Sequence, residues 1–354
     1  MIDFSDSDSI KTLSESVGQT WPAIEQLQQE SRSQLAKLRQ AVASTKPPSN
    51  TATVVFGSLA REEWTRSSDT DWTFLIDGPS DIEHFRATEN IRVAMAKIGI
   101  KDPGATQTFG TMCSSHPLVH HIGGIEDSNQ NMTRRLLLLL ESVALDSSIT
   151  QERVVRAILE RYIFGDPPAS NPKTLRVPLF LLNDIVRMWR TLTVDYAAKK
   201  WQRGEKGWAI RNVKLRMSRK LLFVKGLLVC FACHPSLADN SKSYDTIDVI
   251  NQELMNRCYA LCQLPALSIL ASALHYLDKK PLAIQIMDAY DRFLSTLKDE
   301  EKRKHLEELS LDNSNDSVFE EQRQISRDFR DGLIAFFFDS DERITQLVKR
   351  YGVF

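Results

Sequence analysis

The sequence predicts an α+β protein in which a small mixed β-sheet comes first and an all-helical domain follows. Between residues 51 and about 125, short apolar runs alternate with turns and helical segments. After about Asn129 the strand patterns end, and the long apolar segments have helical spacing. A chain of 354 residues is long enough for two domains with separate cores. We expect a tail and an amphipathic helix over 1–50, the sheet-bearing domain over 51–150 and the helical domain over 151–354.

The expected elements follow from local patterns. Residues 1 to about 15 are polar and are expected to be disordered, and 21–43 carry apolar residues at helical spacing before the breaker "STKPPSNT". In the sheet-bearing domain we expect strands over 53–56, 71–76 and 106–112, and helices over 58–64 and 81–98. The following helices are expected within 131–145, 149–164, 180–201 and 209–233.

Composition excludes a strong global attraction to polyanions. The 45 Lys and Arg residues balance 46 Asp and Glu residues, so we expect no strong binding to duplex nucleic acid. The N-terminus is acidic and polar, unlike a secretory signal, and the longest apolar stretch, 221–233, is too short to span a bilayer. With five cysteines and no expected export signal, we expect a cytoplasmic protein without disulfides.

The stretch "VVFGSLAREEWTRSSDTDWTFLID", residues 54–77, carries the clearest chemistry. Asp69 and Asp71 stand two apart beside an apolar strand, so their side chains are expected on one face, where they repel each other. Mg²⁺ relieves this repulsion, because it prefers oxygen ligands and is held by one or two carboxylates plus substrate phosphates. Upstream, Gly57 and Ser58 lie where a strand turns into a helix, a place where backbone N–H groups can bind an anion. The stretch therefore predicts a site for a nucleoside triphosphate.

The motif "GSLAREE" at 57–63, followed by "SDTD" at 68–71, resembles the signature of the polymerase-β-like nucleotidyltransferase superfamily. Within that superfamily, the residues Ala60, Arg61 and Glu63 of the motif are most similar to those of the PII uridylyltransferase group and related bacterial signalling nucleotidyltransferases. The helix "MTRRLLLLLES" is also similar to the Leu-Leu-Glu helix that follows their catalytic sheet. The resemblance covers residues 53 to about 145. It implies that Asp69 and Asp71 hold two Mg²⁺ ions, for which Mn²⁺ can substitute, and that a nucleotide passes from an NTP or dNTP to an acceptor hydroxyl with release of pyrophosphate.

Two parts of this pattern are open. The superfamily usually adds a third carboxylate on a neighbouring strand, but 104–115 contains no acid; Glu126 or Asp127 is the candidate if a further strand runs through "LVHHIGGIED". Arg61 either braces the turn or contacts a phosphate.

The helical domain offers a positive patch in an otherwise neutral chain. By the same resemblance, Arg211, Lys214 and Ser218, expected on one helical face, are candidates for triphosphate contacts; a solvated basic face is the alternative. Trp189, Trp201 and Trp208 are candidates to stack on a base, with core packing as the alternative for the first.

Two clusters invite a metal-site interpretation. His116, His120 and His121 stand close together, but Pro117 argues against a helix that would align the first two. A second set combines a Cys-x-x-Cys-His segment with a later cysteine pair, yet each cysteine falls in an apolar helical stretch where free thiols are commonly buried. Its members are Cys230, Cys233, His234, Cys258 and Cys262.

Three hypotheses for function follow. The first is a nucleotidyltransferase whose acceptor is a protein hydroxyl, a small molecule or another nucleotide; the last would make an oligonucleotide signal, as enzymes of bacterial antiphage defence do. The second is a catalytically degenerate nucleotide-binding antitoxin or regulatory partner of a toxin or effector, favoured by the missing third acid. The third, a DNA-repair polymerase, is disfavoured by the neutral composition. The N-terminal helix could pack on its own chain or on a second copy.

Overall fold

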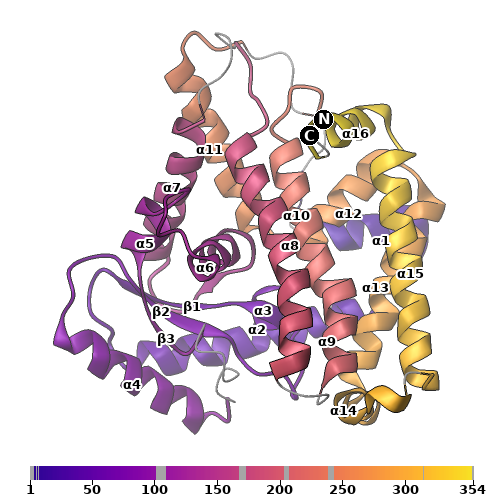
Figure 1. Ribbon diagram of the computed structural model, residues 1–354, viewed down its shortest axis with the longest axis horizontal. Helices are drawn as coiled ribbons and strands as arrows, with labels where there is room; N and C mark the ends of the chain where they lie inside the picture. Colours follow the sequence, from indigo (N-terminus) through magenta and orange to yellow (C-terminus); the bar gives the residue numbers. More distant parts are fainter. Residues whose placement is uncertain are drawn as a thin grey trace. The chain divides into compact units, whose positions relative to one another are not determined.

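A computed structural model describes residues 4, 6, 8–100, 109–166, 173–202, 207–237, 243–313 and 315–352 (Figure 1). The predicted α+β class is confirmed, since a small mixed sheet near the N-terminus is followed by helices. The chain forms two compact units. The sheet unit comprises Leu27–Ala169 and Asn251–Pro265, and the helical unit comprises Met1–Gln26, Ser170–Ile250 and Ala266–Phe354. The sheet unit thus continues beyond residue 150, where the sequence places the end of the sheet-bearing domain.

Within the described residues, four strands form one sheet in the order β3-β2-β1-β4. Strands β1 (Thr51–Val55) and β2 (Trp72–Ile76) are antiparallel, whereas β3 (Thr111–Ser114) runs parallel to β2. A short strand, β4 (Val143–Ala144), pairs antiparallel with β1. The expectation that strands end after Asn129 is therefore wrong, because a two-residue strand is too short to show a period-two pattern.

Helices cover both faces of this sheet. On one face, α2 (Pro22–Ala43) and α4 (Ile82–Lys97) contribute Leu38 and Ile91 to a core that also contains Trp72 and Phe74 of β2. On the other face lie α5 (Ser115–His120) and α6 (Asn129–Leu140) (Figure 1). Leu118 of α5 and Leu138 of α6 line a small cavity together with Leu75 of β2. Helices α3 (Gly57–Ala60), α7 (Ser148–Phe164) and most of α11 (Ile247–Gln263) complete the unit. Apolar residues alternate between the two faces along β2, as the pleat requires.

The helical unit begins with α1 (Ser9–Val17), although the sequence was expected to be disordered to about residue 15. Ile10 and Leu13 are buried, and α1 packs on α12, so a tertiary partner orders a segment with little apolar content. The remaining elements are α8 (Leu179–Gln202), α9 (Trp208–Lys214), the π-helical η1 (Leu215–Arg219), α10 (Lys220–Phe231), α12 (Ala266–Leu277), α13 (Lys280–Lys298), α14 (Glu300–Glu308), the 3₁₀ turn η2 (Leu311–Asn313), α15 (Ser317–Phe338), α16 (Glu342–Leu347) and the π-helical η3 (Val348–Gly352).

Pairs of these helices form the core of the helical unit, with α13 packed along α15 and α10 packed on both α8 and α12. Tyr290 of α13 and Phe329 of α15 are fully buried with ring centroids 5.4 Å apart. In the described part of the chain, no single helix is long and apolar enough to cross a bilayer, and only the bent pair Ile247–Gln263 and Ala266–Leu277 meets that criterion together.

Candidate functional site

The Gly-Ser turn and the second aspartate are in direct contact. Strand β1 ends at Val55, and the N–H of Phe56 donates to the carbonyl oxygen of Asp71 over 2.9 Å. Gly57 then adopts a left-handed backbone with φ of +68°, and a Cβ at this position would lie only 2.9 Å from Oδ2 of Asp71. Both the conformation and the close approach require glycine. The antiparallel pairing of β1 with β2 thus brings the turn and the carboxylate to the same end of the sheet.

The face to which Asp71 belongs follows from the pleat of β2. Trp72 and Phe74 point into the core with α2 and α4, whereas Thr73 and Leu75 line the face covered by α5 and α6. Asp71 is two residues before Thr73, so its side chain lies on the same face as Thr73, the one covered by α5 and α6. Its side chain is half-buried, while Asp69 precedes the strand and is exposed.

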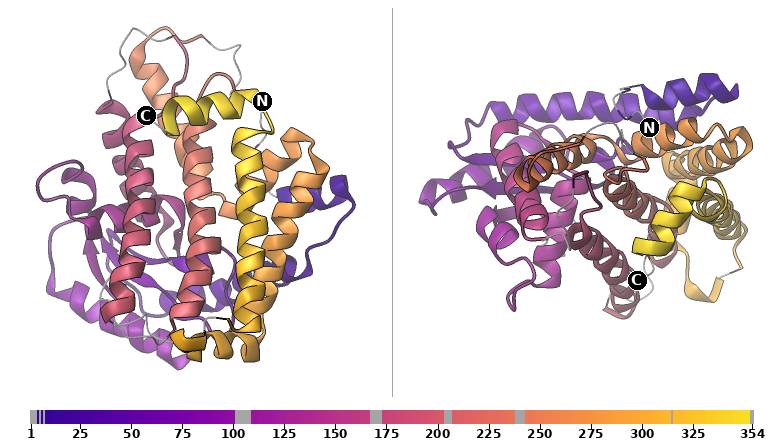
Figure 2. Two further views of the ribbon diagram at one scale, coloured as in Figure 1. Left: turned by 45° about the vertical axis from the view of Figure 1, so that its right-hand side comes forward. Right: turned by 90° about the horizontal axis from the view of Figure 1, so that it is seen from above.

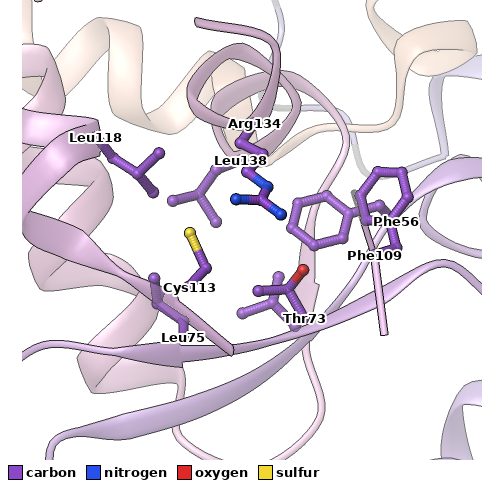
Figure 3. A pocket seen from close by; sticks show the side chains of 9 residues that line it. Phe56, Thr73, Leu75, Phe109, Cys113, Leu118, Arg134 and Leu138 are labelled. Atoms are coloured by element: carbon purple, nitrogen blue, oxygen red, sulfur yellow. The ribbon is translucent and has the colours of Figure 1, made fainter. Parts of the chain in front are cut away.

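Beyond Asp71, this face is closely packed (Figure 3). The rings of Phe56 and Phe109 lie 5.2 Å apart, and the guanidinium of Arg134 points toward them between Cys113 and Thr73. Burial raises the pKa of the Cys113 thiol, and the nearby Arg134 acts in the opposite direction. The cavity that these side chains leave is about 10 Å³, close to the minimum for one water molecule, so any nucleotide must lie outside it.

The neighbouring strand carries no acid where a third metal ligand is expected. Thr111 of β3 pairs with Thr73 of β2, so continuing the register places Phe109 beside Asp71. In the described part of the candidate segment, 109–115, the side chains are aromatic, small or apolar. Residues 104–108 lie outside the described residues.

The further strand through 118–127, on which the choice of Glu126 or Asp127 depends, does not form, because α5 covers Ser115–His120 and turns follow it. Pro117 lies in the first turn of α5, where a helix does not need its N–H, so the argument from proline against a helix fails. His116 and His120 consequently face each other with ring centroids 4.7 Å apart.

Glu126 and Asp127 have different surroundings. Asp127 is buried and accepts two hydrogen bonds from the guanidinium of Arg135 over 3.0 and 2.9 Å, while Nε of Arg135 donates to the hydroxyl of Tyr162 over 2.7 Å. Asp127 thereby neutralises the buried charge of Arg135, which would be left uncompensated without it. The Glu126 side chain is 72% exposed and lies 3.3 Å from Nε2 of His121.

Arg61 takes part in a buried ion-pair cluster behind the Gly-Ser turn. Its Nε donates to Glu63 over 3.0 Å, and its Nη1 donates to Glu141, which follows the last residue of α6. The three side chains are at most 7% exposed, so the guanidinium is directed into the protein. Of the two roles left open for Arg61, this arrangement favours bracing. Sequence reasoning did not identify Glu141 as a partner of Arg61. The available signal was an acidic residue directly after the run of leucines in the helix "MTRRLLLLLES".

The candidate phosphate ligands of the helical unit do not share one regular helical face. Arg211 and Lys214 belong to α9, but Ser218 lies in the π-helical η1 and is 2% exposed. A π-helix holds more residues per turn than an α-helix, so the spacing that predicts one face across all three no longer applies. Arg211 and Lys214 are half-buried.

The aromatic candidates differ as well. Trp189 stacks on Phe223 with centroids 5.4 Å apart and planes 16° apart. Trp208 is buried and its Nε1 donates to the carbonyl oxygen of Leu309 over 2.7 Å, so it is a core residue. The side chain of Trp201 lies outside the described residues.

All five cysteines are buried and none is in a disulfide, and Sγ of Cys233 lies 3.3 Å from the carbonyl oxygen of Val229 in its own helix. Across the residues that the structure describes, no group of three or more His, Cys, Asp and Glu side chains is arranged to hold a metal ion. Asp69 and Asp71 are only two carboxylates, so the absence of groups of three or more does not bear on them.

No protein-family profile matches this chain, and no curated protein sequence matches it.

Proposed function

We propose that this protein is a nucleotidyltransferase of the polymerase-β-like type, which transfers a nucleotide from an NTP or dNTP to an acceptor hydroxyl and releases pyrophosphate. The observation that supports the proposal is the contact between the Gly57 turn and the Asp71 carboxylate. A site that binds a metal–triphosphate complex needs a backbone turn for phosphate and a metal-binding carboxylate side by side. The two motifs also lie at one end of the sheet, through the pairing of β1 with β2.

The residues at this end of the sheet fit Mg²⁺ or Mn²⁺. Asp69 and Asp71 offer only carboxylate oxygens, the donor type that these hard cations prefer, and glycine at position 57 leaves open the space that a Cβ would fill beside Asp71. Such a cation would supply charge neutralisation for a triphosphate and a lower pKa for the attacking hydroxyl. Asp71 would be held in place by its backbone pairing with Phe56, and the Arg61, Glu63 and Glu141 cluster would hold the turn.

The acceptor stays open between a protein hydroxyl, a small molecule and a second nucleotide, and an oligonucleotide product would suggest a role in antiphage signalling. Arg211, Lys214 and Ser218 are retained as triphosphate candidates in the helical unit. We also infer a cytoplasmic location, because none of the five cysteines is in a disulfide and an oxidising compartment favours disulfides.

A second candidate function is a nucleotide-binding regulatory partner, such as an antitoxin, that does not turn over. Two observations favour it. Phe109 stands next to Asp71 in the strand register, where the superfamily usually has an acid, and Asp127 is held in a buried ion pair with Arg135. A protein with two carboxylates could then bind Mg²⁺ with a triphosphate and fail to activate an acceptor.

Pyrophosphate release with each NTP and dNTP in the presence of Mg²⁺, together with direct nucleotide binding, separates the two functions. For the enzyme, we expect release that falls at least about 100-fold in Asp71→Asn, the scale for losing a group that stabilises the transition state. Asp312→Asn, at an exposed position in the helical unit, is the matched control and should keep the wild-type rate. Binding without release supports the regulatory partner, and neither binding nor release refutes both. A mass spectrum after the reaction distinguishes self-modification from a free oligomer.

A further inference from the structure

The helical unit contains an apolar pocket that the proposed transfer reaction does not use. It lies among α8, α10, α15 and η3, which are neighbours within this unit (Figure 2), and has a volume of about 290 Å³. This is near the lower end of the range for small-molecule sites, roughly 300–1,000 Å³. Its walls are mainly aromatic and aliphatic, with contributions from Trp189, Phe223, Leu227, Leu333, Phe337 and Val348.

Two cations line this otherwise apolar pocket, Lys220 at the start of α10 and Arg330 on α15. Arg330 forms an exposed ion pair with Asp331 over 2.8 Å. Among the described residues, the side-chain ammonium of Lys220 has neither a hydrogen bond nor a salt bridge, although the side chain is only partly exposed. An ammonium group in apolar surroundings without a carboxylate partner is unfavourable unless an anion joins it.

The surrounding charge also favours an anion. Burial and the neighbouring Arg330 and Arg216 lower the pKa of Lys220 to about 8, while Asp331 acts in the opposite direction. Arg323 and Arg327 add to the positive potential felt at Arg216. The one acidic group that acts on Lys220 is therefore opposed by two arginines, and Lys220 still carries a proton for most of the time at neutral pH.

Two apolar side chains that line the pocket stay in contact with solvent. Ile334 and Phe338, one helical turn apart on α15, are 47% and 45% exposed. Covering them removes apolar surface from water, which is favourable in proportion to the area covered. The pocket thus combines a surface for an apolar ligand with two cationic side chains among its lining residues.

We propose that this pocket binds a medium-chain carboxylate, with its chain against the α8, α10 and α15 side chains and its carboxylate at Lys220 and Arg330. The proposal is independent of nucleotide transfer, since it rests on residues of the helical unit alone. It would give the protein a second ligand class, amphiphilic anions of the kind that fatty-acid metabolism or lipid hydrolysis supplies.

Calorimetric titration of the full-length protein with decanoate and with decanol tests the proposal, because the two probes share a chain and differ in charge. We expect decanoate to bind the wild type more tightly than decanol. In Lys220→Met, decanoate should bind about tenfold more weakly, the scale for losing a hydrogen bond to a charged group, while decanol keeps its affinity. In Ile334→Asp, both probes should bind more weakly, because the new carboxylate repels the anion and interrupts the apolar surface.

The matched controls are Lys304→Met and Val194→Asp, which introduce methionine and aspartate at two positions, 72% and 68% exposed, that do not line the pocket. Both should bind decanoate as the wild type does, and circular dichroism checks that each variant is folded. The proposal is overturned if the wild type binds no decanoate, if decanol and decanoate bind equally, or if Lys220→Met and Lys304→Met have the same effect. Sedimentation that shows a dimer dissociated by Ile334→Asp but not by Val194→Asp would also overturn it, by identifying a second copy as the occupant.

Discussion

Replacing Gly57 with alanine tests the geometry on which the proposed site depends. A non-glycine residue in the left-handed region loses about 1–2 kcal/mol, and Gly57 has a φ of +68°. The added Cβ would also lie 2.9 Å from Oδ2 of Asp71, so the carboxylate must move by about 0.5 Å to reach ordinary contact near 3.4 Å. A misplacement of about 1 Å can lower an enzymatic rate about 100-fold, so half of that displacement predicts a loss of about tenfold.

Gly99→Ala is the matched control, because Gly99 has a φ of +76° and nothing within 4 Å of its added Cβ. In urea unfolding, both variants should be less stable than the wild type by the cost of placing alanine in the left-handed region. Only Gly57→Ala should also reduce pyrophosphate release or, for a regulatory partner, nucleotide affinity. The clash itself can be isolated in an Asp71→Ala background, where Gly57→Ala should destabilise no more than Gly99→Ala does. Equal stability losses for the two glycine variants in the wild-type background, together with unchanged function, would refute the close approach.

Three further predictions concern buried charges. Glu141→Gln should lower the free energy of unfolding by about 3–5 kcal/mol, because it weakens the buried cluster around Arg61; urea titration measures this, and a loss below about 1 kcal/mol would contradict the buried pairing. Asp127→Asn should have a cost of the same order by leaving Arg135 without its carboxylate, and a wild-type unfolding midpoint would argue against that ion pair. For Lys220, the folded pKa of about 8 lies below the ordinary 10.5, so the unfolded chain binds more protons between these values. Stability relative to Lys220→Met should therefore rise as the pH increases from 8 to 10.5, and unfolding curves whose difference stays constant over that range would contradict the lowered pKa.

The Gly-Ser turn shows how much of the site can be predicted from sequence. A glycine between two apolar runs and two acids with period-two spacing are local features, since they depend on backbone conformation and strand pleat within a few residues. Strands β1 and β2 and helices α2 and α4 follow the predicted segments closely for the same reason. The metal, the nucleotide and the reaction remain predictions that rest on this local pattern.

Elements with weak local signals were predicted less well. Strand β4 has two residues, α1 contains few apolar side chains, and α5 includes a proline, so each resembles a loop when its neighbours are unknown. Their structure depends on pairing with β1, on packing against α12 and on the tolerance of a first helical turn for proline.

By itself, the sequence determined the α+β class, the positions of strands β1 and β2 along the chain and the place of the Gly57 turn between them. Only the tertiary structure decided that Arg61 pairs with Glu141, that Asp127 pairs with Arg135 of α6 beside Tyr162 of α7, and that Lys220 lines an apolar pocket with Arg330. The physical reason is the distance along the chain over which each interaction acts. Backbone conformation and side-chain alternation are set by neighbouring residues, whereas the partner of a buried charge depends on which distant segments pack against it.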